Sequence, residues 1–348
     1  MQRRTFTTAA AGALACGALL GLGRRPRAQE VTLKVAHFLP AAAPAHALFM
    51  EPWARQVEAE SDGRIKVEIY PAMQLGGRAP QLYDQLRDGI ADVVWTLPGY
   101  TPGRFPTIEV FELPFLPATA EATSQAVQAF YEKHQLQEFA DIHPLMFHVH
   151  APGLFHMKGE PIRTLEDLEG KKIRAPTRVI NDTLGALGAT PVGMPVPQVP
   201  EALSRGVVDG VVIPWEVSRP LRVHELTDSH TSFAGDRGFY TSVFLYGMNK
   251  NVYESLPDDL KTVIDNNSGM ALAQKIGKVW DGAEEPGRQA AEEVGAEFYT
   301  IEGDELERWK EASQPVIDRW TEQMSANGQD GAALVEDARS LIEQYEAS

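Results

Sequence analysis

The chain alternates short hydrophobic strands with amphipathic helices, and this alternation limits the folds that are open to it. Residues 31–38, 64–71 and 90–98 have the length and the β-branched content of strands. Residues 45–61 and 79–89, which lie between them, space their apolar side chains as helices do. Strands that are separated by helices pair in parallel and are covered by those helices. The pattern therefore predicts a layered α/β fold.

The same pattern begins again after about residue 150. Residues 171–176 and 207–214 have the character of strands, and residues 177–188 and 199–206 that of helices. A chain whose strand–helix pattern restarts half-way is expected to build two α/β units.

Two stretches echo each other across these units. LRDGIADVVWTLPG begins at Leu86 and LSRGVVDGVVIPWE at Leu203, and each contains a helix end, a glycine, a hydrophobic strand and a proline. This similarity reflects either the common pattern of a helix, a glycine and a strand or the presence of two structurally similar lobes. In two such lobes a ligand crevice lies beyond the carboxyl ends of the strands. The side chains expected there are His37, Phe38, Trp95 to Pro98, Arg174 and Ile213 to Glu216.

Residues 1–28 have the three parts of an export signal. Arg3 and Arg4 precede an apolar Ala/Gly/Leu stretch, and Ala28 is a suitable cleavage residue. The arginine pair indicates the twin-arginine route, with an uncleaved membrane anchor as the less favoured alternative. The only cysteine, Cys16, lies in this segment, so the mature chain would have no thiol. That composition suits an oxidising compartment, and we expect the protein in the periplasm.

The length and the charge of the mature chain exclude several classes of function. About 320 residues remain after the signal, more than one core usually serves, so two lobes are expected. The net charge is −16, and removal of residues 1–28, with five arginines and no acidic residue, makes it −21. Such an acidic surface argues against nucleic acid and anionic lipid as partners. It still permits an anionic ligand, because surface charges are screened within about 8 Å.

The last third of the chain changes character. Residues 238–256 contain a long strand that could cross between the lobes. Pro257 opens a helix that runs beyond ordinary length, and two more helices follow at about 304–324 and 330–346. The long helix either leans on both lobes or belongs to a C-terminal helical layer.

Catalytic motifs are absent from the sequence. It contains no G-x-S-x-G elbow, H-E-x-x-H, C-x-x-C, P-loop or EF-hand pattern. His148 and His150 share a strand face, and His156 follows soon after. A metal site would need a further ligand that is not visible nearby, so hydrogen-bonding histidines are preferred and no metal or cofactor is expected. These observations favour a protein that is not an enzyme.

Arg174 is the most informative single residue. It lies between Ile173 and Ala175 at the end of a short strand, just before Pro176. A guanidinium beside a helix N-terminus binds a carboxylate well, because its donors form a planar fork and the helix dipole adds to the attraction. The alternative is an arginine that is solvated or paired with an acidic residue at 166 or 167.

Residues 31–348 resemble the extracytoplasmic solute-binding proteins of tripartite ATP-independent periplasmic (TRAP) transporters, the dicarboxylate-binding type. The matching stretches are VEIYPAMQLGG, LRDGIADVV, PIRTLEDLEGKKIRAP, LGATPVGMP, ALSRGVVDGVVIP and MNKNVYESLPDDLK. The resemblance implies a two-lobed binding protein that closes over an organic acid and passes it to the permease subunits in the membrane. It also implies a long helix spanning both lobes, and it makes Arg174 the clamp for the ligand carboxylate.

We accordingly expect lobe I at 29–150, lobe II at 151–250 and C-terminal helices at 251–348, in a chain that acts as a monomer. A periplasmic sensor that docks on a receptor would share this architecture. An enzyme built on the same lobes would need an acid–base pair in the crevice and is the less favoured alternative.

The departures from the family pattern concern the ligand. Members that bind sialic acid have polar residues where this chain has Leu97, Leu154 and Ile213. Unpartnered ligand hydroxyls would cost about 1–3 kcal/mol each, so a sugar acid is disfavoured. We expect a monocarboxylate, aromatic or 2-oxo, with a histidine at its polar group and Glu216 accepting a hydroxyl or holding a bridging cation. The crevice residues expected around it are Arg174, Trp215, Glu216, His37, Phe38, Trp95, His148, His150, Phe155, His156, Phe239 and Tyr240.

Overall fold

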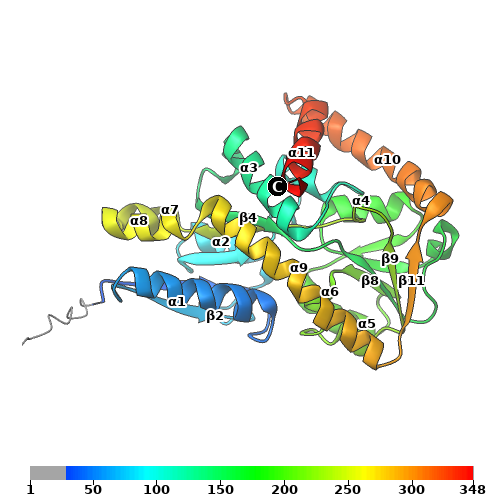
Figure 1. Ribbon diagram of the computed structural model, residues 1–348, viewed down its shortest axis with the longest axis horizontal. Coiled ribbons are helices and arrows are strands. Elements are labelled where there is room, and N and C mark those ends of the chain that lie inside the picture. Colours follow the sequence, from blue (N-terminus) through cyan, green and yellow to red (C-terminus); the bar gives the residue numbers. More distant parts are fainter. Residues whose placement is uncertain (1–28, 348) are drawn as a thin grey trace, which may run out of the picture.

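The computed structural model describes residues 29–347, so the expected export signal lies outside the described residues. Two sheets form the framework, and helices pack around them (Figure 1). The first sheet has five strands, in the order β2 (Ile65–Tyr70), β1 (Val31–Ala36), β3 (Val93–Thr96), β10 (Val243–Met248) and β4 (His143–Val149). The second has six, in the order β11 (Glu297–Ile301), β9 (Ser229–Phe233), β5 (Leu154–Met157), β8 (Gly210–Ile213), β6 (Lys172–Ala175) and β7 (Thr190–Gly193).

The predicted α/β fold is confirmed, but parallel pairing holds only for part of each sheet. β1 pairs in parallel with β2 and β3, and β6 with β7 and β8. β10 is antiparallel to both β3 and β4, and β5 is antiparallel to β8 and β9. These antiparallel strands flank the places where the chain passes from one sheet to the other. β5 and β10 run antiparallel to their neighbours because each follows a crossover between the sheets, whereas the parallel strands are joined by helices.

Helices cover both sheets. Those that precede or follow strands of the two lobes are α1 (Glu51–Glu60), α2 (Leu82–Arg87), α3 (Ala120–His134), α4 (Arg178–Ala186), α5 (Val199–Ser204), α6 (Trp215–Ser218) and α7 (Lys250–Ser255). The C-terminal ones are α8 (Asp258–Asn266), α9 (Gly269–Glu293), α10 (Gly303–Ala326) and α11 (Gly331–Glu346). The predicted helix 45–61 begins as a π-helical turn, Ala45–Met50, before α1. Among the described residues no helix combines the length and apolarity needed to cross a membrane.

β10 moves the lobe boundary away from its expected place. We assigned residues 151–250 to the second lobe, but β10 lies between β3 and β4 in the first sheet. The chain therefore enters the second lobe after β4 and returns to the first between β9 and β10. The long strand that was expected to cross between the lobes within 238–256 is instead the six-residue β10, which lies in the first sheet, and the crossing is made by the segment before it.

The long helix expected after Pro257 is two helices. Asn267 interrupts them, because its backbone carbonyl accepts the indole N–H of Trp53 and its amide donates to Glu60, both on α1. Gly269 then starts α9 with a φ of 67°, in the left-handed region that favours glycine.

α9 crosses the molecule diagonally and touches both lobes (Figure 1). Two glycines permit this close approach. A Cβ at Gly277 would lie 2.5 Å from the Cα of Glu121 at the start of α3, and one at Gly287 would collide with the backbone of Trp215 at the start of α6. Of the two alternatives left open for the long helix, the structure shows the one that the family resemblance implied: α9 contacts both lobes, with its backbone close to theirs.

Candidate functional site

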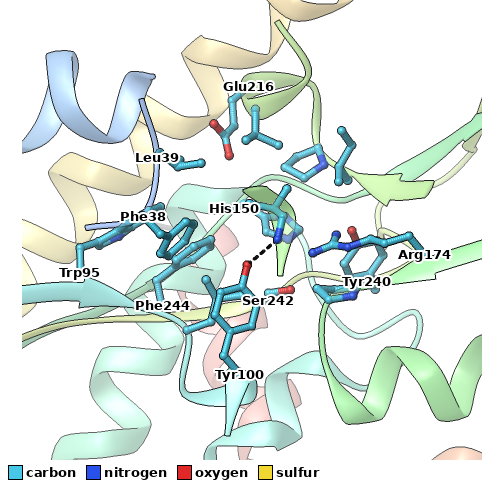
Figure 2. A pocket seen from close by; sticks show the side chains of 16 residues that line it. Phe38, Leu39, Trp95, Tyr100, His150, Arg174, Glu216, Tyr240, Ser242 and Phe244 are labelled. Atoms are coloured by element: carbon cyan, nitrogen blue, oxygen red, sulfur yellow. Dashed lines mark hydrogen bonds between the residues drawn. The ribbon is translucent and has the colours of Figure 1, made fainter. Parts of the chain in front are cut away.

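A cavity that contains about 360 Å³ of space free of protein atoms, part of it open to solvent, lies where segments of the two sheets meet (Figure 2). Its walls come from the ends of β3, β6, β8 and β10 and from the loops that follow β1 and β4. The lining residues are Phe38, Leu39, Trp95, Leu97, Tyr100, His150, Arg174, Pro176, Val196, Ile213, Pro214, Glu216, Val217, Tyr240, Ser242 and Phe244.

Arg174 presents one free donor group to this cavity. Its side chain is only 2% exposed, and its Nε and Nη1 donate to the carbonyls of Met194 and Val212 at 3.0 and 3.1 Å. Nη2 is buried and has no partner. Burial lowers the pKa of Arg174, and the phenols of Tyr100 and Tyr240 act in the opposite direction. A buried cation held by neutral groups, with a free N–H face, is a site for an anion.

An aromatic wall stands on the other side of the cavity (Figure 2). Trp95 is stacked between Phe38 and Phe244, with ring centroids 4.9 and 4.6 Å apart and interplanar angles of 22° and 6°. The indole N–H of Trp95 donates to His148 Nε2 at 2.8 Å, which fixes the indole plane. Burial lowers the pKa of His148 to about 3, so this histidine is a neutral acceptor. The wall offers a flat apolar surface with its one polar group already satisfied.

His150 lines the cavity as a neutral acceptor. Its Nδ1 lies 2.5 Å from the carbonyl oxygen of Ala151 and therefore carries the proton, which leaves Nε2 with a lone pair. Burial lowers the pKa of His150 to about 4, and the charge of Arg174 adds to this effect. At neutral pH the imidazole contributes no charge to the site.

Glu216 lies on a third side of the cavity (Figure 2). Its side chain is 4% exposed, and Oε2 has no partner. Burial, reinforced by the carboxylate of Glu284, raises the pKa of Glu216 well above its ordinary value. Glu284 accepts the backbone N–H groups of Trp215 and Glu216 at 3.1 and 2.9 Å, which positions this turn of the chain.

Contacts between the lobes surround the cavity. The hydroxyl of Tyr100 accepts the backbone N–H of Val196 at 3.1 Å. The hydroxyl of Thr177 donates to Glu112 at 2.6 Å, and next to it Arg178 pairs with Glu109. Each of these pairs joins a segment of the first lobe to one of the second. The structure is therefore the closed form of the cleft.

The structure brings together nine of the residues that the sequence singled out: Phe38, Trp95, Leu97, His150, Arg174, Ile213, Pro214, Glu216 and Tyr240. Other expected crevice residues do not line the cavity, and this corrects the expectation for them. His37 is buried behind the aromatic wall, where its Nε2 lies 2.9 Å from His46 Nδ1. His156 forms a similar pair with His230, at 2.9 Å between the Nδ1 atoms.

The remaining three aromatic residues belong to the packing of the second lobe. Phe155 stacks on Phe239 at 5.3 Å, inside the core that also contains Trp309. Trp215 packs edge-on against the ring of His156 at 4.7 Å. Large aromatic side chains are more often packed in a core than exposed in a site, and all three are packed here.

Tyr100, Val196, Ser242 and Phe244 line the cavity but were not expected there. A signal existed for two of them, because Tyr240, Ser242 and Phe244 alternate along the strand and so share one face. Tyr100 and Val196 lie in short 3₁₀ turns, Pro98–Tyr100 and Val196–Gln198, whose approach depends on the closure of the cleft. Among residues 29–347, no three His, Cys, Asp or Glu side chains are grouped so as to hold a metal ion.

Comparison with known proteins agrees with this architecture. Residues 35–323 match the family model described as bacterial extracellular solute-binding protein, family 7 (DctP). The chain belongs to this family. The resemblance of the sequence to TRAP solute-binding proteins is thereby confirmed, and so is the two-lobed fold.

Solved structures of TRAP solute-binding proteins superpose closely on this family member. One, from an unidentified marine microbe and specific for aromatic acid ligands, is 51% identical with a TM-score of 0.90 in complex with 3-hydroxybenzoate. The match covers 91% of this chain and 99% of that one. A surface mutant of the same protein, in complex with metahydroxyphenylacetate, is 52% identical with a TM-score of 0.89. A protein from Rhodoferax ferrireducens T118, with copurified benzoate, is 45% identical over 91% of this chain and 98% of that one, with a TM-score of 0.89.

Proposed function

We propose that this solute-binding protein captures an aromatic monocarboxylate in the periplasm and delivers it to the membrane subunits of a TRAP transporter. The observation that carries the proposal is the free Nη2 of Arg174, which faces a cavity whose far wall is the stacked Phe38, Trp95 and Phe244. One end of the cavity suits a carboxylate and the other suits a flat ring.

Two further observations support an aromatic over a sugar-derived acid. Leu97 and Ile213 contribute apolar surface to the cavity. A polyhydroxylated ligand would bury hydroxyls against them without partners, at a cost of about 1–3 kcal/mol each. The structures that are 45–52% identical to this chain contain benzoate, 3-hydroxybenzoate and metahydroxyphenylacetate.

The mechanism follows from the two lobes. In the open form the anion meets Arg174 on the second lobe, and closure then brings Phe38 and Trp95 of the first lobe against its ring. Exclusion of water strengthens the ion pair, because the effective dielectric constant falls. Tyr100 and Glu112 contact the second lobe in this structure, through Val196 and Thr177, and such contacts would favour closure. The ligand undergoes no covalent change.

Calorimetric titration of the purified mature protein tests this function. Benzoate, an aliphatic monocarboxylate of similar size, a 2-oxo acid and a sugar acid are compared at one pH. We expect benzoate to bind and the sugar acid to fail. Selective binding of the sugar acid, or no binding of any carboxylate, would overturn the proposal. A thermal shift with each acid provides an independent readout, since a ligand of the folded state raises the melting temperature.

A further inference from the structure

Glu216 occupies a wall of the cavity, and the capture of a simple aromatic carboxylate proposed above gives its carboxyl group no task. Its carboxyl group is buried, and Oε2 has no hydrogen-bond partner. An unpartnered buried polar atom destabilises the protein, and a ligand group placed beside it would recover that loss. The structure thus offers a second polar contact besides Arg174.

The surroundings of Glu216 favour its neutral form. Burial and the carboxylate of Glu284, on the neighbouring helix α9, raise the pKa of Glu216, and the indole N–H of Trp280 opposes them less strongly. Glu284 already accepts the backbone N–H of Glu216. A bound carboxylate at Arg174 would bring a further negative charge into the same enclosed space. A neutral carboxyl offers one donor and one acceptor, which matches a phenolic hydroxyl.

The direction of Glu216 selects the position of that hydroxyl. In Figure 2 its carboxyl lies off the line that runs from the Arg174 guanidinium to the rings of Phe38 and Phe244. A ligand with its carboxylate at Arg174 and its ring toward those side chains directs a para substituent along this line. A meta substituent points away from this line, and Glu216 lies on one side of it and Ser242 on the other (Figure 2).

We propose that Glu216 distinguishes hydroxylated from unsubstituted aromatic acids, through a neutral carboxyl group that hydrogen-bonds a meta hydroxyl of the ligand. This inference rests on the proposed function, because it takes the carboxylate to bind at Arg174. Glu216 would thus determine which aromatic acids the protein prefers.

The test compares benzoate, 3-hydroxybenzoate and 4-hydroxybenzoate by calorimetric titration on the wild type, Glu216→Gln and Glu216→Leu. Glutamine has the shape of the neutral acid and keeps a donor and an acceptor, whereas leucine keeps neither. We expect the wild type and Glu216→Gln to prefer 3-hydroxybenzoate over benzoate by about tenfold, or 1.4 kcal/mol. In Glu216→Leu this preference disappears, so that the ratio of the two affinities falls to about one. Should Glu216→Leu not accumulate, Glu216→Ala removes the same carboxyl group.

The outcomes separate this inference from the proposed function. A preference for the 3-isomer that survives in Glu216→Leu overturns the inference alone. So does its loss in Glu216→Gln, since a charged carboxylate or a bound cation would then be required. Failure of the wild type to bind all three acids overturns the proposed function and the inference with it.

Discussion

Asp281 and Glu284 lie one turn apart on α9, but their carboxylates hold different lobes. Asp281 accepts the first two backbone N–H groups of α3 at 2.8 and 2.9 Å. Glu284 accepts the first two of α6 at 3.1 and 2.9 Å. Carboxylates suit such positions because the first N–H groups of a helix have no partner within it and its dipole is positive there. One helix therefore ties both lobes by the same chemistry.

Replacing Asp281 should destabilise the protein. Asp281→Ala leaves two N–H groups of α3 without an acceptor, and we expect the free energy of unfolding to fall by about 1–3 kcal/mol. Urea denaturation measures the change. Glu285→Ala, at an exposed position on the same helix, is the matched control and should change stability by less than about 0.5 kcal/mol. Equal losses in the two variants would refute the capping role.

Truncating Arg174 should weaken ligand binding without unfolding the protein. We expect Arg174→Ala to cost about 2–5 kcal/mol of binding free energy for benzoate, because the ligand carboxylate is buried without its partner. Arg174→Lys should lose less, since it keeps the charge but not the planar fork. Calorimetric titration measures both, with Arg205→Ala, at an exposed arginine of the same lobe, as control. Binding to Arg174→Ala within twofold of the wild type would rule out the clamp.

Gly99 should control the closure of the cleft. A Cβ at this position would lie 2.5 Å from Cγ2 of Thr177 on the opposite lobe. Gly99→Ala should therefore disfavour the closed form and weaken ligand binding by about tenfold, while stability in the absence of ligand changes little. Adding Thr177→Ser removes Cγ2 and keeps the hydroxyl that bonds Glu112, so it should restore part of the affinity. If the double variant binds no better than Gly99→Ala, the steric explanation is wrong.

Glu112 should make stability depend on pH. Burial raises its pKa from 4.5 to about 8, although Thr177 and the backbone N–H of Val243 both donate to it. The folded state therefore keeps a proton that the unfolded chain releases, and this contribution to stability is lost as the pH rises from 4.5 toward 8. The slope for one such group is at most about 1.4 kcal/mol per pH unit.

The variant Glu112→Gln isolates that contribution. It resembles the protonated side chain, so it should match the wild type at pH 5 and be the more stable of the two at pH 9. Urea denaturation at pH 5, 7 and 9 measures the difference, with Glu68→Gln, at an exposed position, for comparison. A difference between Glu112→Gln and the wild type that stays constant with pH would contradict the assignment.

Local patterns in the sequence were enough to predict most strands and helices. Arg174 is an example, because the apolar neighbours and the following proline indicated a buried strand end before a helix. Two features depended on partners that are distant in the sequence. The break before α9 arises from hydrogen bonds between Asn267 and α1, which lie more than 200 positions away. β10 joins the first sheet because its backbone pairs with β3 and β4.

The histidines show why the site was only partly predictable. His150 lines the cavity, but His37 and His156 are each paired with another histidine, 9 and 74 positions away. A buried histidine pair satisfies its own hydrogen bonds and leaves no mark in the local sequence. Strand ends identify which residues are near a cleft, and only the packing determines which of them turn into it.

The position of β10 in the first sheet limits when the first lobe can complete its folding. β3 and β4 are not neighbours, since β10 lies between them. A growing chain must therefore reach residue 248 before its first sheet can be completed. By then most of the second sheet, apart from β11, has already been synthesised. The lobe that begins first must wait for the strand between β3 and β4, so it cannot complete its sheet before most of the second lobe has been synthesised.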